Sequence, residues 1–402
     1  MQNKMTNLPQ GWEVKKLEEI ANIKGGKRLP KGENLLDNNT KFTYIRVADF
    51  QDNGTINLQN IKFINENTYN VLKNYKIYDD NLYISIAGTI GKSGIIPKEL
   101  NGAILTENAV KLEYIQNNIS NKFMYFFTLS NIFKTQIQTS TKIVAQPKLA
   151  ITRLKQIQIP LPPLKEQERI VGILDESFAK IDESIKILEQ DLLNLDELMQ
   201  SALQKAFNPL KDNVKENYKL PQSWEWKSLE EISENISAGG DKPKNCTESK
   251  TAKNQIPVYA NGVNNNGLVG YTDKATIIKP SLTISARGTI GFVCIRKEPY
   301  FPIVRLISLI PCENILCLHY LYFCLNFFIA KGEGSSIPQL TIPKFKSLQI
   351  PLPPLKEQEQ IAKHLDFVFE KTKALKELYT KELKDYEELK QSLLNKAFKG
   401  EL

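Results

Sequence analysis

Histidine is almost absent from this chain of 402 residues, which contains only His319 and His364. That scarcity argues against catalysis by a histidine base or by a nucleophile that histidine activates. The sequence also lacks a Gly-x-Ser-x-Gly elbow and a glycine-rich dinucleotide fingerprint. Its longest apolar run, around residues 316–329, is interrupted by His319 and Asn326. We therefore expect neither a membrane span nor a signal peptide.

Cysteine is scarce as well, and the five residues have no spacing typical of a disulfide framework. This usage favours a reducing compartment, so we expect a cytoplasmic protein. Cys312, Cys317, His319 and Cys324 are the one group that could gather a zinc ion. Their spacing fits no usual zinc knuckle, and the matching segment of the first half has Phe, Asn and Thr in that register. Buried cysteines on an apolar helix are the favoured interpretation, and we expect no metal.

Two motifs of nucleotide and methyl-transfer enzymes are incomplete. Residues 88–93, Gly-Thr-Ile-Gly-Lys-Ser, resemble the end of a P-loop, but a P-loop requires glycine where this chain has Ile86. The lysine is replaced by Phe292 in the second half, so we interpret the motif as a turn between strands. A self-sufficient adenine methyltransferase would need Asn/Asp-Pro-Pro-Tyr/Phe, whereas both Pro-Pro pairs here are flanked by leucines. We expect the chain to catalyse nothing.

One stretch of eleven residues, Gln-Ile-Pro-Leu-Pro-Pro-Leu-Lys-Glu-Gln-Glu, occurs at 158–168 and again at 349–359. Its prolines remove backbone donors and favour extended neighbours, so a helix can begin only around Leu164. After each copy, apolar residues recur every three or four positions, and both segments end with Lys-Ala-Phe. This pattern predicts two helices of about 44 residues, each with one apolar stripe. We expect them to pair as a coiled coil, antiparallel if a globular domain lies between them.

The duplication extends beyond these helices. Residues 8–20 resemble residues 220–232, both with Leu-Pro-x-x-Trp, and residues 85–91 resemble residues 285–291, both with Gly-Thr-Ile-Gly. Between these landmarks the two halves differ in sequence and in length. Shared ends with divergent middles indicate that each half recognises something different.

The net charge of +8 is unevenly distributed. Residues 1–159 carry +8, from 21 basic and 13 acidic side chains, and residues 211–350 carry +5, from 17 and 12. Residues 160–210 carry −5, and residues 351–402 are neutral. The positive excess therefore lies wholly outside the predicted helices, which favours a polyanion as the partner. Lysine used only for solubility is the alternative interpretation.

These patterns predict an α+β protein with a pseudo-twofold repeat. Two globular α/β domains, residues 1–159 and 211–350, are separated by two long antiparallel helical regions, residues 160–210 and 351–402, which form an intramolecular coiled coil. Each domain is expected to contain a mainly antiparallel sheet. The expected strands are 42–47, 82–86, 94–96, 109–114, 256–259, 268–271, 282–285, 292–295 and 304–310. The expected helices are 17–23, 120–136, 229–236 and 315–329.

Cations and amides in loops are the candidates for DNA contact, because phosphates attract cations and base edges are read by bidentate donors or amides. In the first half they are Lys24, Lys27, Arg28, Tyr44, Arg46 and Lys92. In the second half they are Lys242, Lys244, Asn264, Asn265, Arg287, Arg296 and Lys297. Any one of these can equally be a solvated surface group. Their common placement in loops and turns of both halves supports the set.

With its two dissimilar domains, its doubled Ile-Pro-Leu-Pro-Pro-Leu-x-Glu-Gln helix signature and Leu-Pro-x-x-Trp at the head of each half, the chain resembles the specificity subunit of a Type I restriction-modification enzyme. The resemblance covers essentially the whole chain. It implies that the globular parts are target-recognition domains, each of which reads one half of a split, asymmetric DNA site. It also implies that the antiparallel helices set the gap between the two halves.

The resemblance further implies partners. They are double-stranded DNA, two modification subunits that bind S-adenosylmethionine and methylate adenine N6, and in some complexes two restriction subunits that use ATP and magnesium. All these cofactors belong to the partners, and none is expected in this non-catalytic chain. The implied docking surface for modification subunits includes Leu161, Leu164, Glu168, Leu352, Leu355 and Glu359. A coiled-coil scaffold that binds no DNA is the alternative function, and it predicts no salt-dependent duplex binding.

Overall fold

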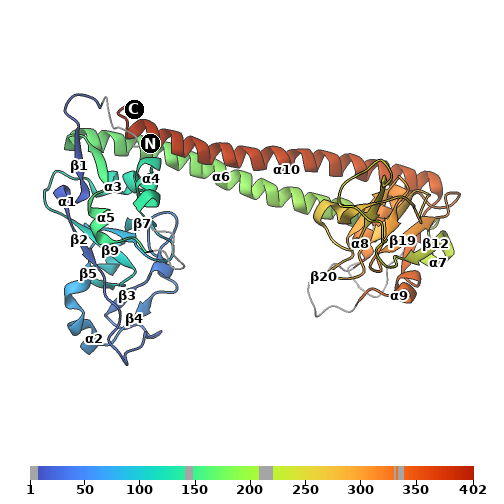
Figure 1. Cartoon of the computed structure of the whole chain (residues 1–402), viewed down its shortest axis with the longest axis horizontal. Helices are drawn as coiled ribbons and strands as arrows, with labels where there is room; N and C mark the ends of the chain where they lie inside the picture. Colours follow the sequence, from blue (N-terminus) through green and yellow to red (C-terminus); the bar gives the residue numbers. More distant parts are fainter. Residues whose placement is uncertain (1–7, 141–147, 208–220, 330–331, 334–338) are drawn as a thin grey trace. The chain divides into compact units, whose positions relative to one another are not determined.

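The computed structural model describes residues 8–140, 148–207, 221–329, 332–333 and 339–402 (Figure 1). The chain divides into two compact units. Unit 1 comprises Met1–Leu188 and Lys381–Leu402, and unit 2 comprises Glu189–Thr380. Three residues of the repeated motifs lie outside the described residues: Pro147, Pro338 and Leu220. Among the described residues, no helix has the length and apolarity needed to cross a membrane.

Two long helices, α6 (Leu164–Phe207) and α10 (Leu355–Ala397), each begin directly after a Pro-Pro pair. The predicted start at Leu164 is confirmed. In unit 1, Lys390 near the end of α10 pairs with Asp182 in the first half of α6, at 2.5 Å. In unit 2, Lys376 pairs with Asp196, so an earlier residue of α10 faces a later residue of α6. The predicted antiparallel pairing is therefore confirmed.

The globular domain of unit 1 contains two four-stranded sheets. The first is antiparallel, in the order β2 (Ala21–Gly25), β9 (Ala109–Tyr114), β6 (Leu82–Ser85) and β7 (Ser93–Ile95). The second has the order β4 (Lys62–Phe63), β3 (Thr43–Ile45), β8 (Ala103–Leu105) and β5 (Lys76–Ile77), and β3 and β8 run parallel. The helices of this domain are α1 (Leu17–Ile20), α2 (Glu66–Val71), α3 (Asn121–Leu129), α4 (Asn131–Ser140) and α5 (Ile151–Lys155).

Unit 2 repeats this order. Its antiparallel sheet is β12 (Ser233–Ala238), β19 (Ile307–Pro311), β15 (Ser281–Ile284) and β17 (Val293–Arg296). Its second sheet is β14 (Leu268–Thr272), β13 (Ile256–Tyr259) and β18 (Phe301–Pro302), with β13 and β18 parallel. Two further strands, β16 (Thr289–Ile290) and β20 (Gly332–Glu333), pair with each other. The helices are α7 (Leu229–Ile232), α8 (Leu318–Phe328) and α9 (Ile342–Lys346).

Each repeated proline segment also forms a strand before its helix begins. Strand β10 (Gln158–Leu161) pairs antiparallel with β1 (Glu13–Lys16), and β21 (Gln349–Leu352) pairs with β11 (Glu225–Ser228). The strands β1 and β11 directly follow the Leu-Pro-x-x-Trp motif, so the two repeated signatures lie side by side. Each pair ties the head of a domain to the start of a long helix.

Several predicted boundaries are wrong for local reasons. The helices expected at 17–23 and 229–236 end at Ile20 and Ile232, and the residues that follow join the antiparallel sheets as β2 and β12. The helix expected at 120–136 is two helices, because the Ser130 side chain caps a new start by accepting from the Phe133 amide. The strand expected at 304–310 begins only at Ile307, because Val304 and Arg305 have positive φ angles.

Each domain core is completed by the end of the helix from the other repeat. The core of the N-terminal domain includes Leu394, Ala397 and Phe398, and the Phe398 ring lies 5.1 Å from that of Phe123. The core of the second domain includes Leu203 and Phe207. The duplicated Lys-Ala-Phe sequence is therefore a packing element, since its phenylalanines are fully buried.

A buried glutamine fixes the start of each long helix to its domain. Gln167 accepts a hydrogen bond from the Ser120 amide at 2.8 Å and donates to the carbonyls of Asn118 and Pro162. Gln358 makes the equivalent bonds with the Cys317 amide and the carbonyls of Ile315 and Pro353. Buried polar groups must be paired, so the three backbone groups around each amide restrain the direction in which the helix leaves its domain.

We predict that Phe398→Ala destabilises the N-terminal domain, although the residue lies at the far end of the sequence. Loss of a fully buried phenylalanine costs about 3–5 kcal/mol of unfolding free energy. Amide hydrogen exchange of the intact chain should accelerate in β6 and β9 and stay unchanged in β15 and β19. Phe207→Ala should give the reverse pattern, and Leu389→Ala, at an exposed position of α10, should change neither. Equal acceleration in both sheets would refute the assignment.

Candidate nucleic-acid interface

A pair of glycines lies at the end of the first strand of each antiparallel sheet: Gly25 ends β2 and Gly26 follows it, and Gly239 and Gly240 follow β12. A Cβ on Gly26 would collide with the carbonyl oxygen of Thr106, and a Cβ on Gly239 would lie 2.6 Å from the amide nitrogen of Ile303. Only glycine fits such close approaches of backbone to backbone. The two loops that carry the predicted cations thus leave their sheets at equivalent points.

In the first domain the predicted cations lie beside carboxylates. Lys24 pairs with Glu113 at 2.5 Å, Lys92 with Asp52 at 2.7 Å, and Arg46 with the buried Asp49. Arg28 Nε lies 2.8 Å from Glu107 Oε1, although its side chain is 79% exposed. Lys27 lies over the ring of Tyr75, at 5.9 Å.

The Arg28 ion pair influences the Glu107 carboxyl group. Partial burial raises the pKa of Glu107, but hydrogen bonds from Arg28, the Thr106 hydroxyl and its own amide lower it, and the net pKa is below its usual value. Glu107 is therefore an ionised acceptor at neutral pH. Its two oxygens accept from Arg28 and from Thr106, at 2.8 and 2.9 Å.

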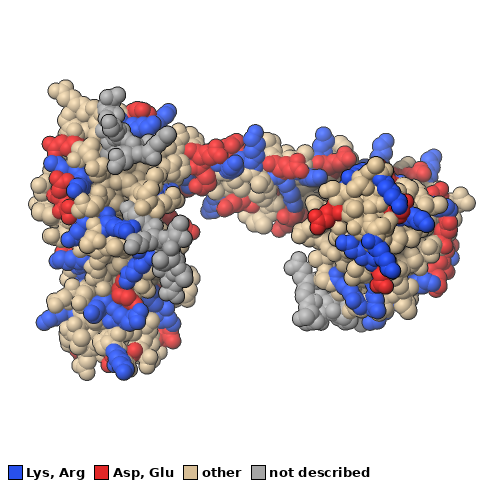
Figure 2. Space-filling view, in the orientation of Figure 1, with Lys and Arg blue, Asp and Glu red and all other residues tan. Residues whose placement is uncertain are grey.

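In the second domain Lys242, Lys244 and Lys297 are exposed, and so are Asn264 and Asn265. Arg287 is exposed in the Gly-Thr-Ile-Gly turn and donates to Gln339 at 3.2 Å. The Lys and Arg side chains on the visible faces of both domains can be followed in Figure 2. These positions remain predicted DNA contacts.

Two predicted contact residues have packing roles. Tyr44 is buried, and its hydroxyl donates to the carbonyl of Lys27 at 2.8 Å. Arg296 is also buried, where its guanidinium stacks on the Tyr259 ring at 3.5 Å and its Nε donates to Thr283. Both side chains stabilise the loops around them, so packing accounts for their presence without DNA.

The Gly-Thr-Ile-Gly motif is a turn between adjacent strands in both domains, as predicted. It joins β6 to β7 in the first domain and β15 to β17 in the second, where Thr289 and Ile290 of the motif also form β16. Gly88 and Gly91 have φ angles of 75° and 89°, and Gly288 and Gly291 have 68° and 82°. Left-handed backbone at both ends of the motif explains why both glycines are present.

The structure shows the surroundings of Cys324 and His319, two of the residues considered as zinc ligands. Cys324 is fully buried on α8, and burial raises the pKa of its thiol. His319 Nδ1 lies 2.7 Å from the Asp366 carboxylate, which links α8 to α10. No group of three metal-ligating side chains is found among the residues that the structure describes.

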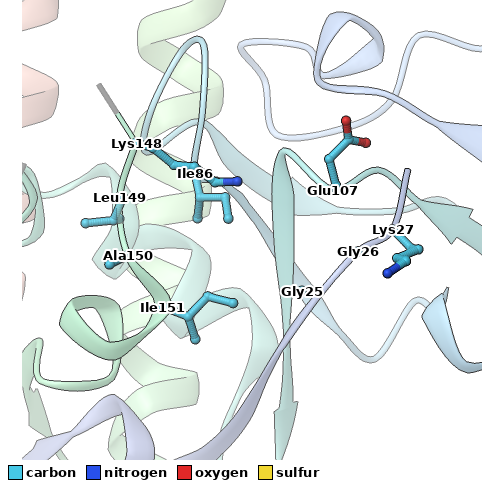
Figure 3. A pocket seen from close by; sticks show the side chains of 9 residues that line it. All are labelled: Gly25, Gly26, Lys27, Ile86, Glu107, Lys148, Leu149, Ala150 and Ile151. Atoms are coloured by element: carbon cyan, nitrogen blue, oxygen red, sulfur yellow. The ribbon is translucent and has the colours of Figure 1, made fainter. Parts of the chain in front are cut away.

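A cavity of about 490 Å³ opens in the first domain beside the Gly25-Gly26 loop. Figure 3 shows Glu107 and Lys27 on one side of it, with Ile86 and the segment from Lys148 to Ile151 on the other. Sequence reasoning missed Glu107 and Lys148. Acidic residues give no signal when cations are sought, and an isolated lysine after a proline resembles any surface group.

The predicted docking residues have matched environments in the two repeats. Leu161 and Leu352 are partly buried against the cores of their own domains. Leu164 and Leu355 are half-buried in the first turn of each long helix, and Glu168 and Glu359 are exposed one turn later. The structure thus presents two equivalent surfaces.

Two duplicated α+β domains with cationic loops, joined by paired long helices, define a bipartite DNA-recognition protein. Comparison with known proteins agrees. The model of the Type I restriction modification DNA specificity domain matches twice, at residues 9–192 and 221–385. The chain therefore belongs to the Type I restriction-modification specificity family, and its role is DNA sequence specificity.

Relatives match over most of their length. A type I specificity subunit of Mycoplasma pneumoniae is 29% identical over 87% of both chains. The type I restriction enzyme MjaX specificity subunit of Methanocaldococcus jannaschii is 24% identical over 98% of this chain and 94% of that protein. A solved chain from a type I restriction-modification system matches with a TM-score of 0.81 at 20% identity, over 98% of this chain and 100% of that chain. The HsdS subunit from Thermoanaerobacter tengcongensis matches with a TM-score of 0.61 at 21% identity, over the whole of both chains.

We predict that the double substitution Lys242→Ala and Lys244→Ala weakens duplex binding equally for all sequences. Removal of each phosphate contact should reduce the slope of log affinity against log salt by about 0.9, hence by about 2 for both. Binding isotherms at several salt concentrations measure this. The control Lys279→Ala removes a cation that pairs with Glu234 at 2.6 Å, and it should leave the slope unchanged. An unaltered slope in the double variant would remove both lysines from the interface.

Proposed function

We propose that each globular domain reads one half of a bipartite, asymmetric DNA site. The observation that carries this proposal is the contrast between backbone and side chains. The two domains share strand order and the position of the Gly-Gly loop and of the Gly-Thr-Ile-Gly turn, yet the side chains on those loops differ. A common scaffold with unlike reading surfaces is the expected design for two different half-sites.

The paired helices are proposed to hold the two readers at one spacing. Once one domain is seated on its half-site, the other binds in an effectively intramolecular step, which requires a spacer that does not change length. Helices α6 and α10 contain 44 and 43 residues without interruption. The glutamine hydrogen bonds and the cross-repeat cores restrain each domain against its end of the helix pair.

The helices are also proposed to dock two modification subunits. Apolar side chains stay exposed along both helices, including Ile187, Leu193, Leu198, Phe367 and Leu378. Exposed apolar groups on a mixed-charge surface fit a protein partner better than a polyanion. The proposed docking surface of one repeat includes Leu161, Leu164 and Glu168, and that of the other includes the matching Leu352, Leu355 and Glu359, one for each modification subunit.

The chemistry is proposed to reside in the partners. Modification subunits would bind S-adenosylmethionine and methylate adenine N6, and restriction subunits, where present, would use ATP and magnesium. The chain itself would be non-catalytic and act in the cytoplasm, where the chromosome lies. This division is supported by the scarcity of histidine and by the absence of a complete catalytic motif in the sequence.

The proposal is tested by exchanging residues 229–348 for the equivalent segment of another family member. This exchange leaves β11, β21 and both long helices in place. A genome-wide map of methylated adenines should change in one half of the recognised site and keep the other half and the gap. A change in both halves would contradict independent reading.

The same hybrid tests docking on the helices. Because the proposed docking residues are retained, two modification subunits should co-purify with the hybrid as they do with the parent chain. Loss of co-purification from a folded hybrid would place the docking surface on the globular domain instead.

A further inference from the structure

One turn occupies the same place in both domains and carries opposite charge. In the first domain it joins β8 to β9, and in the second it joins β18 to β19. The amides of Thr106 and Ile303 donate to the strands beside them, at 3.0 and 2.9 Å. The carbonyls of Ala109 and Leu306 accept from Gly26 and Gly239. The backbone bonds thus align Glu107 with Val304 and Asn108 with Arg305.

The turn of the second domain is strained. Val304 and Arg305 have φ angles of 53° and 58°, although neither is glycine and valine is β-branched. Such conformations persist only where the surroundings impose them, and they cluster at ligand sites. Val304 and Arg305 donate to the carbonyls of Gly240 and Gly239, both at 2.8 Å.

Asn261 holds this turn from the other side. Its Nδ2 donates to the Val304 carbonyl at 2.6 Å, and its Oδ1 accepts from the Ala286 amide at 2.8 Å. The asparagine therefore connects the strained turn to the Gly-Thr-Ile-Gly turn that carries Arg287. Val304 and Arg305 are both exposed, and within the described residues no ion pair joins the Arg305 guanidinium to a carboxylate. The fold presents an exposed arginine on a turn whose backbone is held by hydrogen bonds.

In the first domain the same turn presents a carboxylate. Glu107 lines the cavity shown in Figure 3 together with Lys27 and Lys148. The Glu107 side chain is 25% exposed, and its oxygens accept from Arg28 and the Thr106 hydroxyl, with the Tyr44 hydroxyl 3.5 Å away. Its ion pair with the exposed Arg28 contributes little to stability, and each carboxylate oxygen keeps further acceptor capacity. A carboxylate among DNA-facing cations would repel phosphate. Its useful position is therefore at a base edge, where the amino groups of cytosine and adenine are donors.

We infer that these equivalent turns read bases, with Glu107 accepting from a cytosine or adenine amino group and Arg305 donating to guanine. This inference rests on the proposed function. Lys27 and Lys148 would contact the flanking phosphates. A carboxylate reads donors and an arginine fork reads the two acceptors of guanine, so adjacent positions of one equivalent turn account for unlike half-sites.

The test uses chromosomal substitutions in the native strain and a map of methylated adenines. Arg305→Ala should make one base position degenerate in one half of the site, with discrimination there reduced roughly 10- to 100-fold. Arg305→Lys should give the same result, because lysine keeps the charge and lacks the bidentate fork. Glu107→Gln should make one position degenerate in the other half.

Two matched controls should keep the parental motif. Glu113→Gln removes a carboxylate of similar exposure, 27% against 25% for Glu107, at the far end of β9. Lys279→Ala removes a cation before the start of β15, away from the turn that follows its end. An unchanged motif in the Glu107 and Arg305 variants would overturn the inference. A uniform loss at all sites with Arg305→Ala, restored by Arg305→Lys, would also overturn it, because that result identifies a phosphate contact.

Deletion of the gene in the parent strain distinguishes a failure of this inference from a failure of the proposed function. If deletion of the gene leaves adenine methylation unchanged, the proposed function fails. If deletion removes a bipartite motif and the Arg305→Ala map equals the parental map, the proposed function holds and only the base-reading turn is wrong.

Discussion

Burial of the phenylalanine at the end of each long helix is the interaction on which the architecture depends. Phe398 enters the core that contains Phe123 and Phe127, and Phe207 enters the core that contains Tyr320. Each helix therefore belongs to the domain where it starts and to the domain where it ends. The duplicated sequence is not two independent copies in tandem, because neither domain has a complete core without residues from the other repeat.

This constraint leaves the loops free to differ. The buried glutamines Gln167 and Gln358 make matched hydrogen bonds in the two domains, while the loops after β2 and β12 share only the glycines that close backbone approaches require. New DNA specificity can thus arise by changing exposed side chains on a shared frame. The turn at Val304, between β18 and β19, has a strained backbone that lowers stability, and the hydrogen bonds around it offset this cost.

Periodicity and exact repetition are enough to predict the long helices, their start after the prolines and their antiparallel pairing. Those signals are local, and many residues share them. The DNA-contact set is harder to predict because charge in a sequence does not reveal burial. Arg296 and Tyr44 fit a pattern of contact residues but are held by Tyr259 and Lys27 inside the fold. Arg305 could not be predicted as a contact residue, because it lies in an apolar run that resembles a strand. Its left-handed conformation, like that of Val304, depends on hydrogen bonds to Gly239, Gly240 and Asn261, which are distant in the sequence.

The central claim is that the length of the helix pair sets the gap in the DNA site. The ion pairs of Asp182 with Lys390 and Asp196 with Lys376 define the register of the pair. Deletion of residues 185–191 together with 381–387 removes one heptad from each helix and keeps that register. A helix shortened by seven residues loses about 10 Å, equal to roughly three base pairs. The account predicts that the gap in the mapped methylation site shortens by that amount, and an unchanged gap would contradict it.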